Sequence, residues 1–347
     1  MNAEPEILFD RLGVAGIVTL NRPRALNALT HGMVVAMKAK LEEWAEDEAI
    51  RAVVVRGAGE RAFCSGGDIR AVRESGLAGT SYGRDFWHDE YILNAAIKHY
   101  PKPYIALIHG VCMGGGIGVA VHGQYRLTDG SALFAMPETG IGFFPDVGGS
   151  WFLPRCPGEI GMYMGLTGAR LKLTDALYVG LATHAVPMTK WPELLDVLSA
   201  GEHADKAVAQ FAEPPPPDAP LAAQRKDIDR IFSGGSVEDI LARLDAGTDA
   251  WSRETAATMR TRSPTSLRLV YREVRTGRTI AAFDDCMRME YRMAVRILEG
   301  HDFYEGVRAV LIDRDNTPRW KPPTLAEVPE AAVASYFAPL GEGELRL

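Results

Sequence analysis

The stretch Tyr104-Ile105-Ala106-Leu107-Ile108-His109-Gly110-Val111-Cys112-Met113-Gly114-Gly115-Gly116 decides the fold class. Its first five residues form an unbroken apolar run, which predicts a strand buried on both faces, as in a parallel sheet. The glycines that follow predict a tight turn, and we expect a helix to begin at Gly115. Strand, Gly-rich turn and helix in this order indicate an α/β protein.

A similar strand and turn precede this stretch. Ala52-Val53-Val54-Val55 has the pattern of another buried strand, and it is followed by the turn Ala62-Phe63-Cys64-Ser65-Gly66-Gly67-Asp68-Ile69. Gly16-Ile17-Val18-Thr19-Leu20 is a short β-branched run. A helix between these runs is predicted from apolar residues at helical spacing, with Thr30 as its N-cap. The alternation predicts a parallel sheet with crossover helices.

The second half of the chain changes character. Glu213-Pro214-Pro215-Pro216-Pro217-Asp218 cannot form a helix or a central strand and is expected to be a stiff spacer. Residues 221–312 have a helical pattern, with one helix capped by Ser236 and another over 281–299, and a Pro-rich tail from Asn316 is expected to wrap the surface. We therefore expect a core at 1–212, a spacer at 213–220 and a helical region at 221–347.

Composition excludes several classes of partner. The chain has 347 residues, with 38 Lys and Arg against 45 Asp and Glu, for a net charge of −7. The charges form no basic block, so we expect no nucleic-acid partner and no binding to an anionic membrane surface. A run of about 18 apolar residues, which a membrane-spanning helix needs, does not occur.

Targeting signals and cysteines give an expectation about location. The N-terminus, Met1 to Glu6, is acidic and has the pattern of neither a secretory signal nor an Arg-rich presequence. The four cysteines are far apart and form no CxxC pair, which indicates reduced thiols. These features predict a cytoplasmic protein.

The Gly-rich turns are candidates for binding negative charge. Glycines at 114–116, between a strand and a helix, expose N–H groups at the positive end of that helix, which suits an anion or a developing oxyanion. A dinucleotide-binding loop is the alternative, but Val121 breaks the required spacing. The turn at 65–68 allows a ligand to approach the backbone closely, although it is also explained as a tight structural turn.

Two carboxylates lie in an apolar loop at 136–150. Glu138 and Asp146 are surrounded by Gly, Pro and aromatic residues, and apolar surroundings raise a carboxyl pKa toward the range useful for base catalysis. The alternative is that Glu138 caps a helix and Asp146 forms an Asx-turn. The sequence contains no GxSxG motif and no metal-ligand spacing, and His109 and His122 are expected to be structural.

Taken together, these segments resemble the crotonase (enoyl-CoA hydratase/isomerase) superfamily. The signature residues are Asn21-Arg22-Pro23, Asn27-Ala28-Leu29, Phe63 to Asp68 and His109 to Gly116. Within the superfamily the chain looks most like the 3-hydroxyisobutyryl-CoA hydrolases. That closer match is carried by Phe63 to Arg70, Lys102 to Gly110, Met136 to Gly149 and Gly300 to Asp313. The resemblance covers nearly the whole chain and is weakest near the Pro-rich spacer.

The resemblance implies a fold, a substrate class and binding residues. The fold would be a crotonase-like spiral of ββα repeats, with the helical C-terminal region covering the active site. The substrate would be a coenzyme A thioester, with no metal and no separate cofactor. The N–H groups of Gly67 and Gly115 would form the oxyanion hole. The substrate would also meet the turn residues Ser65, Gly66, Asp68 and Gly114. Family members are commonly homo-oligomers, and the sequence leaves this chain's assembly open.

The choice between hydration and hydrolysis depends on carboxylates. Hydratases of the family use two glutamates, and the first of these positions is Gly118 here. Glu138 fills the second position, and Asp146 matches the hydrolases. Glu138 would act as general base on water or as nucleophile, and Asp146 would assist proton transfer. Glu90 matches a glutamate that would accept a hydrogen bond from a 3-hydroxyl group, with a solvated helical Glu as the alternative.

We therefore expect hydrolysis of a short 3-hydroxyacyl-CoA, first of all 3-hydroxyisobutyryl-CoA in valine breakdown. An enoyl-CoA hydratase or isomerase is the alternative enzyme. A catalytically silent, structural or RNA-associated member is the alternative class, against which the intact carboxylates and turns argue.

Overall fold

The computed structural model describes residues 4–347, which form two compact units that the chain enters more than once. The first unit consists of residues up to Asp68, Ile92–Phe134 and Leu171–Ala222, and the second of Ile69–Tyr91, Ala135–Arg170 and Ala223–Leu347. The segments 69–91 and 135–170 therefore pack with the C-terminal residues. The Pro-rich spacer joins the end of one helix at Phe211 to the start of the next at Pro220.

The first unit is built on a six-stranded sheet. Its strand order is β1-β2-β3-β5-β7-β9. The strands are β1 (Ile7–Leu12), β2 (Ala15–Leu20), β3 (Ala52–Gly57), β5 (Tyr104–Ile108), β7 (Tyr125–Thr128) and β9 (His184–Ala185). Only β1 pairs antiparallel, with β2, while every other pairing is parallel. Every residue of β2 and β5 is buried, which confirms the predicted parallel sheet and its doubly covered strands.

A smaller sheet accompanies the larger one. It has the order β4-β6-β8, formed by β4 (Ala62–Cys64), β6 (Val111–Met113) and β8 (Leu133–Ala135). Each of these strands follows a strand of the larger sheet, so the pairs β3–β4, β5–β6 and β7–β8 repeat along the chain. This repetition is the ββα spiral that the resemblance implied.

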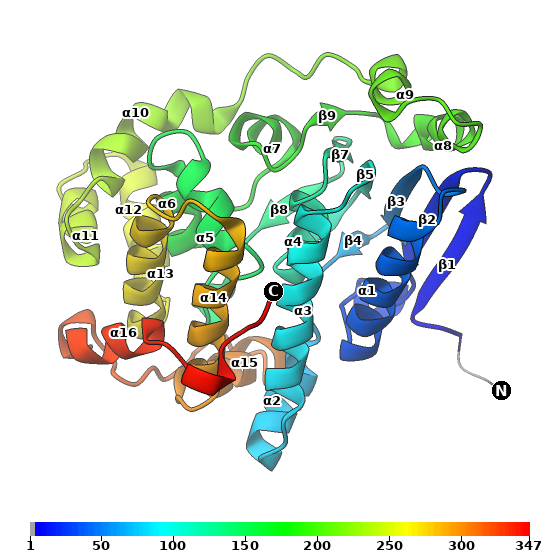
Figure 1. The fold of residues 1–347 in the computed structure, drawn as a ribbon. Helices are drawn as coiled ribbons and strands as arrows, with labels where there is room; N and C mark the ends of the chain where they lie inside the picture. Colours follow the sequence, from blue (N-terminus) through cyan, green and yellow to red (C-terminus); the bar gives the residue numbers. More distant parts are fainter. Residues whose placement is uncertain (1–3) are drawn as a thin grey trace. The chain divides into compact units, whose positions relative to one another are not determined.

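Helices cover the larger sheet. The first unit contains α1 (His31–Glu46), α4 (Gly115–Val121), α7 (Leu173–Val179), α8 (Trp191–Ser199) and α9 (Ala204–Phe211). Thr30 caps α1 as predicted, because its Oγ1 accepts a hydrogen bond from Met33 N at 3.3 Å. One buried core joins Ile17, Val54 and Ile105 of the sheet to Leu194 of α8 and Val208 of α9. Figure 1 shows β1, β2 and β3 adjacent in this sheet.

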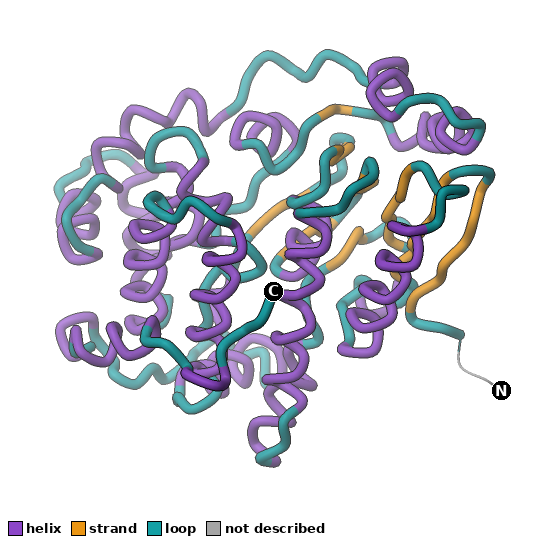
Figure 2. Tube along the Cα trace, viewed as in Figure 1, coloured by secondary structure: helices purple, strands orange, loops and turns teal. Residues whose placement is uncertain are grey.

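The second unit is mainly helical. The strands, orange in Figure 2, belong to the first unit except for Ala135 at the end of β8, while helices occur in both units. The helices of the second unit are α2 (Ile69–Ala78), α5 (Gly149–Phe152), α6 (Ile160–Thr167), α11 (Val237–Asp245), α12 (Ala250–Arg260), α13 (Pro264–Gly277), α14 (Phe283–Ile297), α15 (Asp302–Val307) and α16 (Glu330–Phe337). Two further helices, α3 (Tyr82–Lys98) and α10 (Pro220–Phe232), each contribute residues to both units.

The helical pattern predicted for the C-terminal region is confirmed. Ser236 caps α11 by accepting from Asp239 N at 3.1 Å, and the helix expected at 281–299 runs from Phe283 to Ile297. The tail differs from expectation, because it is not only a wrapping segment: it forms α16, which buries Val333 and contacts α13 and α14.

No helix within residues 4–347 is long and apolar enough to cross a membrane. The expectation about a leader rested partly on Met1, Asn2 and Ala3, which lie outside the described residues.

Candidate active site

The two Gly-rich turns of the first unit lie against each other. Strands β4 and β6 pair in parallel, with Cys64 opposite Cys112, so the turns that follow them are neighbours. A Cβ placed on Gly66 would lie 3.3 Å from Met113 O and 3.6 Å from Gly115 N. Gly66 also has a φ of +116°, a conformation that L side chains rarely adopt. The sequence therefore needs glycine at this position.

The structure places both predicted oxyanion donors in this pair of turns. Gly115 is the first residue of α4, and the N–H groups of a helix's first turn have no partner within the helix. Gly67 follows the tight turn at Gly66 and bridges to Leu29. Gly114, the N-cap of α4, has a φ of +49°. Two N–H groups in neighbouring turns are an arrangement suited to a developing oxyanion.

Side chains of the signature hold the first turn in place. The buried amide of Asn27 donates to Ala58 O at 2.9 Å and to Ala62 O at 2.8 Å. Arg22 pairs with Asp68 at 3.0 Å, and Ser65 N donates to Leu26 O. The Asp68 carboxylate is thus engaged with Arg22, so Asp68 would meet a substrate through its backbone.

The carboxylates of the second unit gather in its interior. Glu138 begins a 3-10 helix at Glu138–Ile141, Asp146 lies in the loop before α5, and Glu90 lies on α3. Their exposed fractions are 6%, 5% and 2%. The hydroxyl of Tyr91 donates to Asp146 Oδ2 at 2.8 Å. Within the described residues, Glu90 Oε1 and Glu138 Oε2 have no hydrogen-bond partner.

These contacts decide two alternatives that the sequence left open. Glu90 is not a solvated helical glutamate, because the helix turns it into the protein interior. The Asp146 side chain accepts from Tyr91, a residue distant in sequence, which an Asx-turn alone does not explain. Glu138 is the first residue of a short helix, but it is not the cap that the structural alternative expected, because Pro137 is the N-cap, no side chain caps this helix, and the Glu138 side chain is buried.

Burial gives these carboxyl groups unusual proton affinity. It raises the pKa of Asp146 to about 7, although the hydrogen bond from Tyr91 acts in the opposite direction. The pKa of Glu138 is raised well above its ordinary value, first by burial and then by the neighbouring charge of Asp146. Burial and Asp146 raise the pKa of Glu90 in the same way. Carboxyl groups that titrate near neutral pH can take up and return protons during a reaction.

Aromatic side chains make the surroundings of these groups apolar. Trp87, three residues before Glu90, stacks on Phe143 with ring centroids 4.8 Å apart. Phe144 stacks on Phe143 at 4.6 Å, and Phe303 lies edge-on to Trp87 at 5.8 Å. This packing explains why the loop at 136–150 carries aromatic residues. It also removes water from around the carboxylates, which strengthens electrostatic interactions there.

Sequence reasoning missed two carboxylates of this interior. Glu273 on α13 and Glu290 on α14 are both 0% exposed. A signal existed for Glu290, because it lies three residues after Met287 and four before Ala294, and these two apolar residues at helical spacing are buried on the same helix. Tyr91 was also missed, since an aromatic residue on a helix gives no sign of a distant partner.

The remaining candidates have structural surroundings. His109 Nε2 lies 2.9 Å from Gly59 O, and burial lowers the pKa of this histidine. Gly118 is buried inside α4, so no carboxylate occupies the position of the first hydratase glutamate. Within residues 4–347 no group of three or more His, Cys, Asp or Glu side chains is arranged to hold a metal ion.

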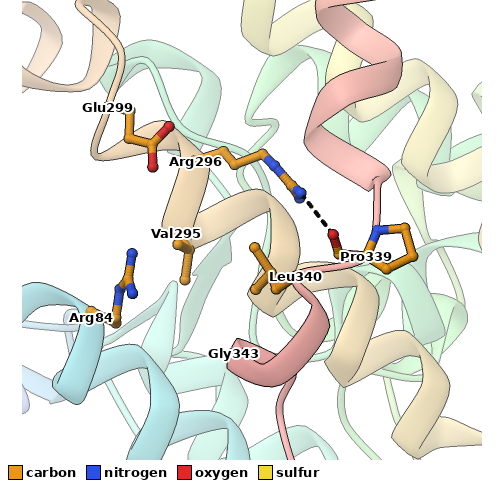
Figure 3. Close-up of a pocket in the computed structure, with 7 residues that line it drawn as sticks. All are labelled: Arg84, Val295, Arg296, Glu299, Pro339, Leu340 and Gly343. Atoms are coloured by element: carbon orange, nitrogen blue, oxygen red, sulfur yellow. Dashed lines mark hydrogen bonds between the residues drawn. The ribbon is translucent and has the colours of Figure 1, made fainter.

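A hollow of about 380 Å³ in the second unit is separate from these residues. It is lined by Arg84, Val295, Arg296, Glu299, Pro339, Leu340 and Gly343. Figure 3 shows Arg296 donating to the carbonyl oxygen of Pro339, at 3.2 Å. None of the predicted site residues lines this hollow, and Arg296, one of its two arginines, is engaged by the C-terminal tail.

Comparison with known proteins places the chain in a family. The model described as enoyl-CoA hydratase/isomerase matches residues 15–337. The chain belongs to this family. Curated relatives named "3-hydroxyisobutyryl-CoA hydrolase, mitochondrial" include a Danio rerio protein, 46% identical over 99% of this chain and 92% of its own length. A Homo sapiens protein of the same name is 40% identical over the same shares.

Solved structures of the family share the fold. A structure described as a carnitinyl-CoA dehydratase from Mycobacterium thermoresistibile has a TM-score of 0.94 and 44% identity, covering 98% of each chain. An enoyl-CoA hydratase from Rhodobacter sphaeroides has a TM-score of 0.92 and 38% identity, covering 99% of this chain and 100% of its own. The solved structures confirm the crotonase-like fold, and the curated relatives confirm the resemblance to the 3-hydroxyisobutyryl-CoA hydrolases.

The curated 3-hydroxyisobutyryl-CoA hydrolases correct one expectation. Their names describe mitochondrial proteins, so the prediction of a cytoplasmic protein is wrong. That prediction rested on the absence of a recognisable leader pattern, which says nothing about the compartment in which relatives of this family work.

Proposed function

We propose that this family member hydrolyses 3-hydroxyisobutyryl-CoA to 3-hydroxyisobutyrate and coenzyme A, a step of valine breakdown. The observation that carries the proposal is the pair of buried carboxyls Glu138 and Asp146, together with glycine at 118 where a hydratase would have its other glutamate. The names of relatives at 40–46% identity over nearly the full chain support the same substrate.

The first requirement of thioester hydrolysis is stabilisation of negative charge. When a nucleophile adds to the thioester carbon, its carbonyl oxygen becomes an oxyanion. The N–H groups of Gly67 and Gly115 are the donors proposed for it, with Ser65, Gly66, Asp68 and Gly114 shaping their turns. One such donor typically contributes roughly 2.7–4 kcal/mol in the transition state.

The second requirement is proton transfer. Glu138 takes a proton from water as the water oxygen bonds to the carbonyl carbon, or its carboxylate attacks that carbon to give an anhydride that water then opens. In both routes the carbon–sulfur bond breaks and coenzyme A leaves as a thiolate. With a pKa of about 7, Asp146 is suited to supply the proton that the thiolate takes up.

The acyl group would be recognised by a further buried carboxyl. Glu90 has an oxygen without a hydrogen-bond partner in the described residues, and a substrate 3-hydroxyl could donate to it. The proposal includes no metal and no cofactor besides the coenzyme A of the substrate, because the carboxyl groups are assigned the roles of base and acid and no redox step occurs. Assembly into a homo-oligomer is also part of the proposal.

Enoyl-CoA hydration is the second candidate. The two solved structures with the same fold are described as a dehydratase and a hydratase of CoA thioesters, which favours it. Against it stands Gly118, which leaves one hydratase position without a carboxylate.

Free-thiol release from 3-hydroxyisobutyryl-CoA, measured beside loss of the enoyl absorbance of crotonyl-CoA, tests the proposal. We expect thiol release without hydration. Glu138→Gln should lower thiol release by about 100-fold or more while substrate binding is kept, because the amide cannot accept a proton. Hydration of crotonyl-CoA without thiol release would identify a hydratase. Full turnover by Glu138→Gln would show that Glu138 takes no part in catalysis.

A further inference from the structure

The carboxylate of Glu290 holds the backbone that directly follows Asp146. It reaches this backbone from α14 and is 0% exposed. Its Oε2 accepts from Gly148 N at 2.8 Å, and its Oε1 accepts from Ser150 N at 2.9 Å and from Ser150 Oγ at 2.5 Å. Three donors on one buried carboxylate form a strong, geometrically restricted contact.

The backbone held in this way is strained. Val147 has a φ of +50° and Gly148 a φ of +91°, so two consecutive residues adopt left-handed conformations. A β-branched residue at positive φ is an outlier that persists only where surrounding contacts impose it. The bonds from Glu290 begin one residue after Val147 and fix the far side of this strained turn.

The strained turn sets the direction of the Asp146 side chain. Asp146 Oδ2 must meet the Tyr91 hydroxyl at 2.8 Å, and the C-terminal side of Asp146 is joined to Val147 by a single peptide bond. If Val147 relaxed to a common β or αR conformation, the chain before Gly148 would rotate, and the carboxylate would be re-aimed. A displacement of about 1 Å at a reacting group can cost about 100-fold in rate.

Several ionisable groups face this contact. Tyr91 on α3, Glu273 on α13 and Asp146 itself interact electrostatically with Glu290, and Cys286 does so from the same helix. Helices α13 and α14 both contact α5, the short helix that begins at Gly149. A change of charge at Glu290 must therefore be felt by Asp146 as well as by the loop.

We propose that Glu290 is a positioning residue for hydrolysis: its carboxylate holds Val147 and Gly148 in their left-handed conformations and so keeps the Asp146 carboxyl aimed at the reaction. This inference rests on the proposed thioester hydrolysis. Glu290 itself touches no substrate atom and acts only through Asp146.

Glu290→Gln is the main test. The amide keeps one acceptor oxygen but turns an N–H₂ group toward a backbone or hydroxyl donor, so at least one of the three bonds is lost. Ser150→Ala removes the hydroxyl bond to Glu290 together with the contact of this hydroxyl with Cys286, and it serves as the milder variant because both backbone donors stay in place. Glu159→Gln is the matched control, because Glu159 is a buried carboxylate of the same unit held by Arg275 at 2.9 Å and Arg278 at 2.7 Å.

The kinetic readouts separate positioning from stability. For Glu290→Gln we expect kcat for thiol release to fall roughly 10- to 100-fold with little change in KM. Re-aiming the Asp146 carboxyl weakens the hydrogen bond that it accepts from Tyr91, so the part of the pH profile that belongs to Asp146 should move toward higher pH. Ser150→Ala should lower kcat less, and Glu159→Gln should change neither kcat nor the pH profile, even if it unfolds more easily.

A readout without substrate completes the test. Amide hydrogen exchange of the segment 147–152 should be faster in Glu290→Gln than in the wild type and unchanged in Glu159→Gln. Unchanged exchange, kcat and pH profile in Glu290→Gln and Ser150→Ala would overturn the inference and leave Glu290 with a structural role. If the wild type releases no thiol from any 3-hydroxyacyl-CoA, the proposed function fails, and exchange alone then decides whether Glu290 holds the loop.

Discussion

At the scale of single residues, the chemistry depends on how one helix presents neighbouring side chains. Glu90 and Tyr91 are consecutive on α3, and both are buried beside Asp146. The Tyr91 hydroxyl donates to the Asp146 carboxylate and thereby stabilises its ionised form, while burial favours the neutral form. The pKa of about 7 is the balance of these opposed effects.

Replacing this tyrosine should shift that balance. In Tyr91→Phe the hydrogen bond to the ionised carboxylate is lost and burial remains, so the pKa of Asp146 rises further and its part of the pH profile moves to higher pH. The direction is the same as that expected for Glu290→Gln, because both variants weaken the Tyr91–Asp146 hydrogen bond. Profiles of kcat against pH for thiol release would measure the shift.

Tyr304→Phe is the control for this substitution. Tyr304 lies in the same unit and donates to Leu298 O at 2.7 Å, without a carboxylate partner. The same shift in both variants would show that the effect is not specific to the Tyr91–Asp146 bond.

At the scale of elements, the Gly-rich turns owe their geometry to close packing of a helix on a strand. A Cβ placed on Gly116, in the first turn of α4, would lie 2.2 Å from the backbone oxygen of Cys64 at the end of β4. Only a residue without a Cβ allows this approach, and the approach brings the start of α4 to the turn at Gly66.

Gly116→Ala should therefore damage both stability and activity. The methyl group must push α4 away from β4, which costs about 1–3 kcal/mol of unfolding free energy and moves the Gly115 N–H. Urea unfolding and thiol release measure the two effects.

Gly130→Ala is the matched control in the same unit, because nothing lies within 4 Å of a Cβ placed there. We expect it to behave as the wild type. An unchanged rate of thiol release in Gly116→Ala would show that the contact between α4 and β4 does not position the proposed oxyanion donors.

At the scale of the whole chain, the second unit contains an unusual number of buried carboxyl groups. Besides Glu90, Glu138 and Asp146, the pKa of Glu273 is raised by burial and by neighbouring carboxylates, and burial raises that of Glu290 to about 8. Neither oxygen of Glu273 has a hydrogen-bond partner in the described residues. The folded protein thus holds protons that the unfolded chain releases.

This arrangement predicts stability that falls as pH rises. The unfolding free energy contributed by Asp146 begins to fall near pH 3.8, the pKa of this group in the unfolded chain. The loss is complete above its folded pKa of about 7 and amounts to on the order of 4 kcal/mol. Glu273→Gln keeps a neutral side chain at every pH, so it should stabilise the protein by about 1–3 kcal/mol near pH 8 and change little near pH 5.

Urea unfolding at the two pH values checks this prediction. Glu159→Gln should behave differently, because it loses ion pairs with Arg275 and Arg278 and gains nothing at high pH. A Glu273→Gln variant that is less stable than the wild type at both pH values would contradict an unpartnered, protonated Glu273.

The sequence by itself determined the repeating part of the molecule. Buried strands, Gly-rich turns and capped helices leave local signatures, and those at 104–116 and 52–69 predicted the parallel sheet and the paired turns. In the loop at 136–150, the sequence placed two carboxylates among apolar residues. Gly118 indicated that the first glutamate of the hydratases is absent from this chain. The division at 213–220 and the roles assigned to the site residues stay predictions.

Only the tertiary structure decided which distant groups meet. The bond from Gly148 N to Glu290 spans 142 residues, and that from Tyr91 to Asp146 spans 55, so neither leaves a pattern within any local window. Burial of Glu90 likewise depends on what α3 packs against. Local patterns fix elements because their causes act within a few residues, whereas carboxyl pKa values are set by long-range packing that excludes water and brings like charges together.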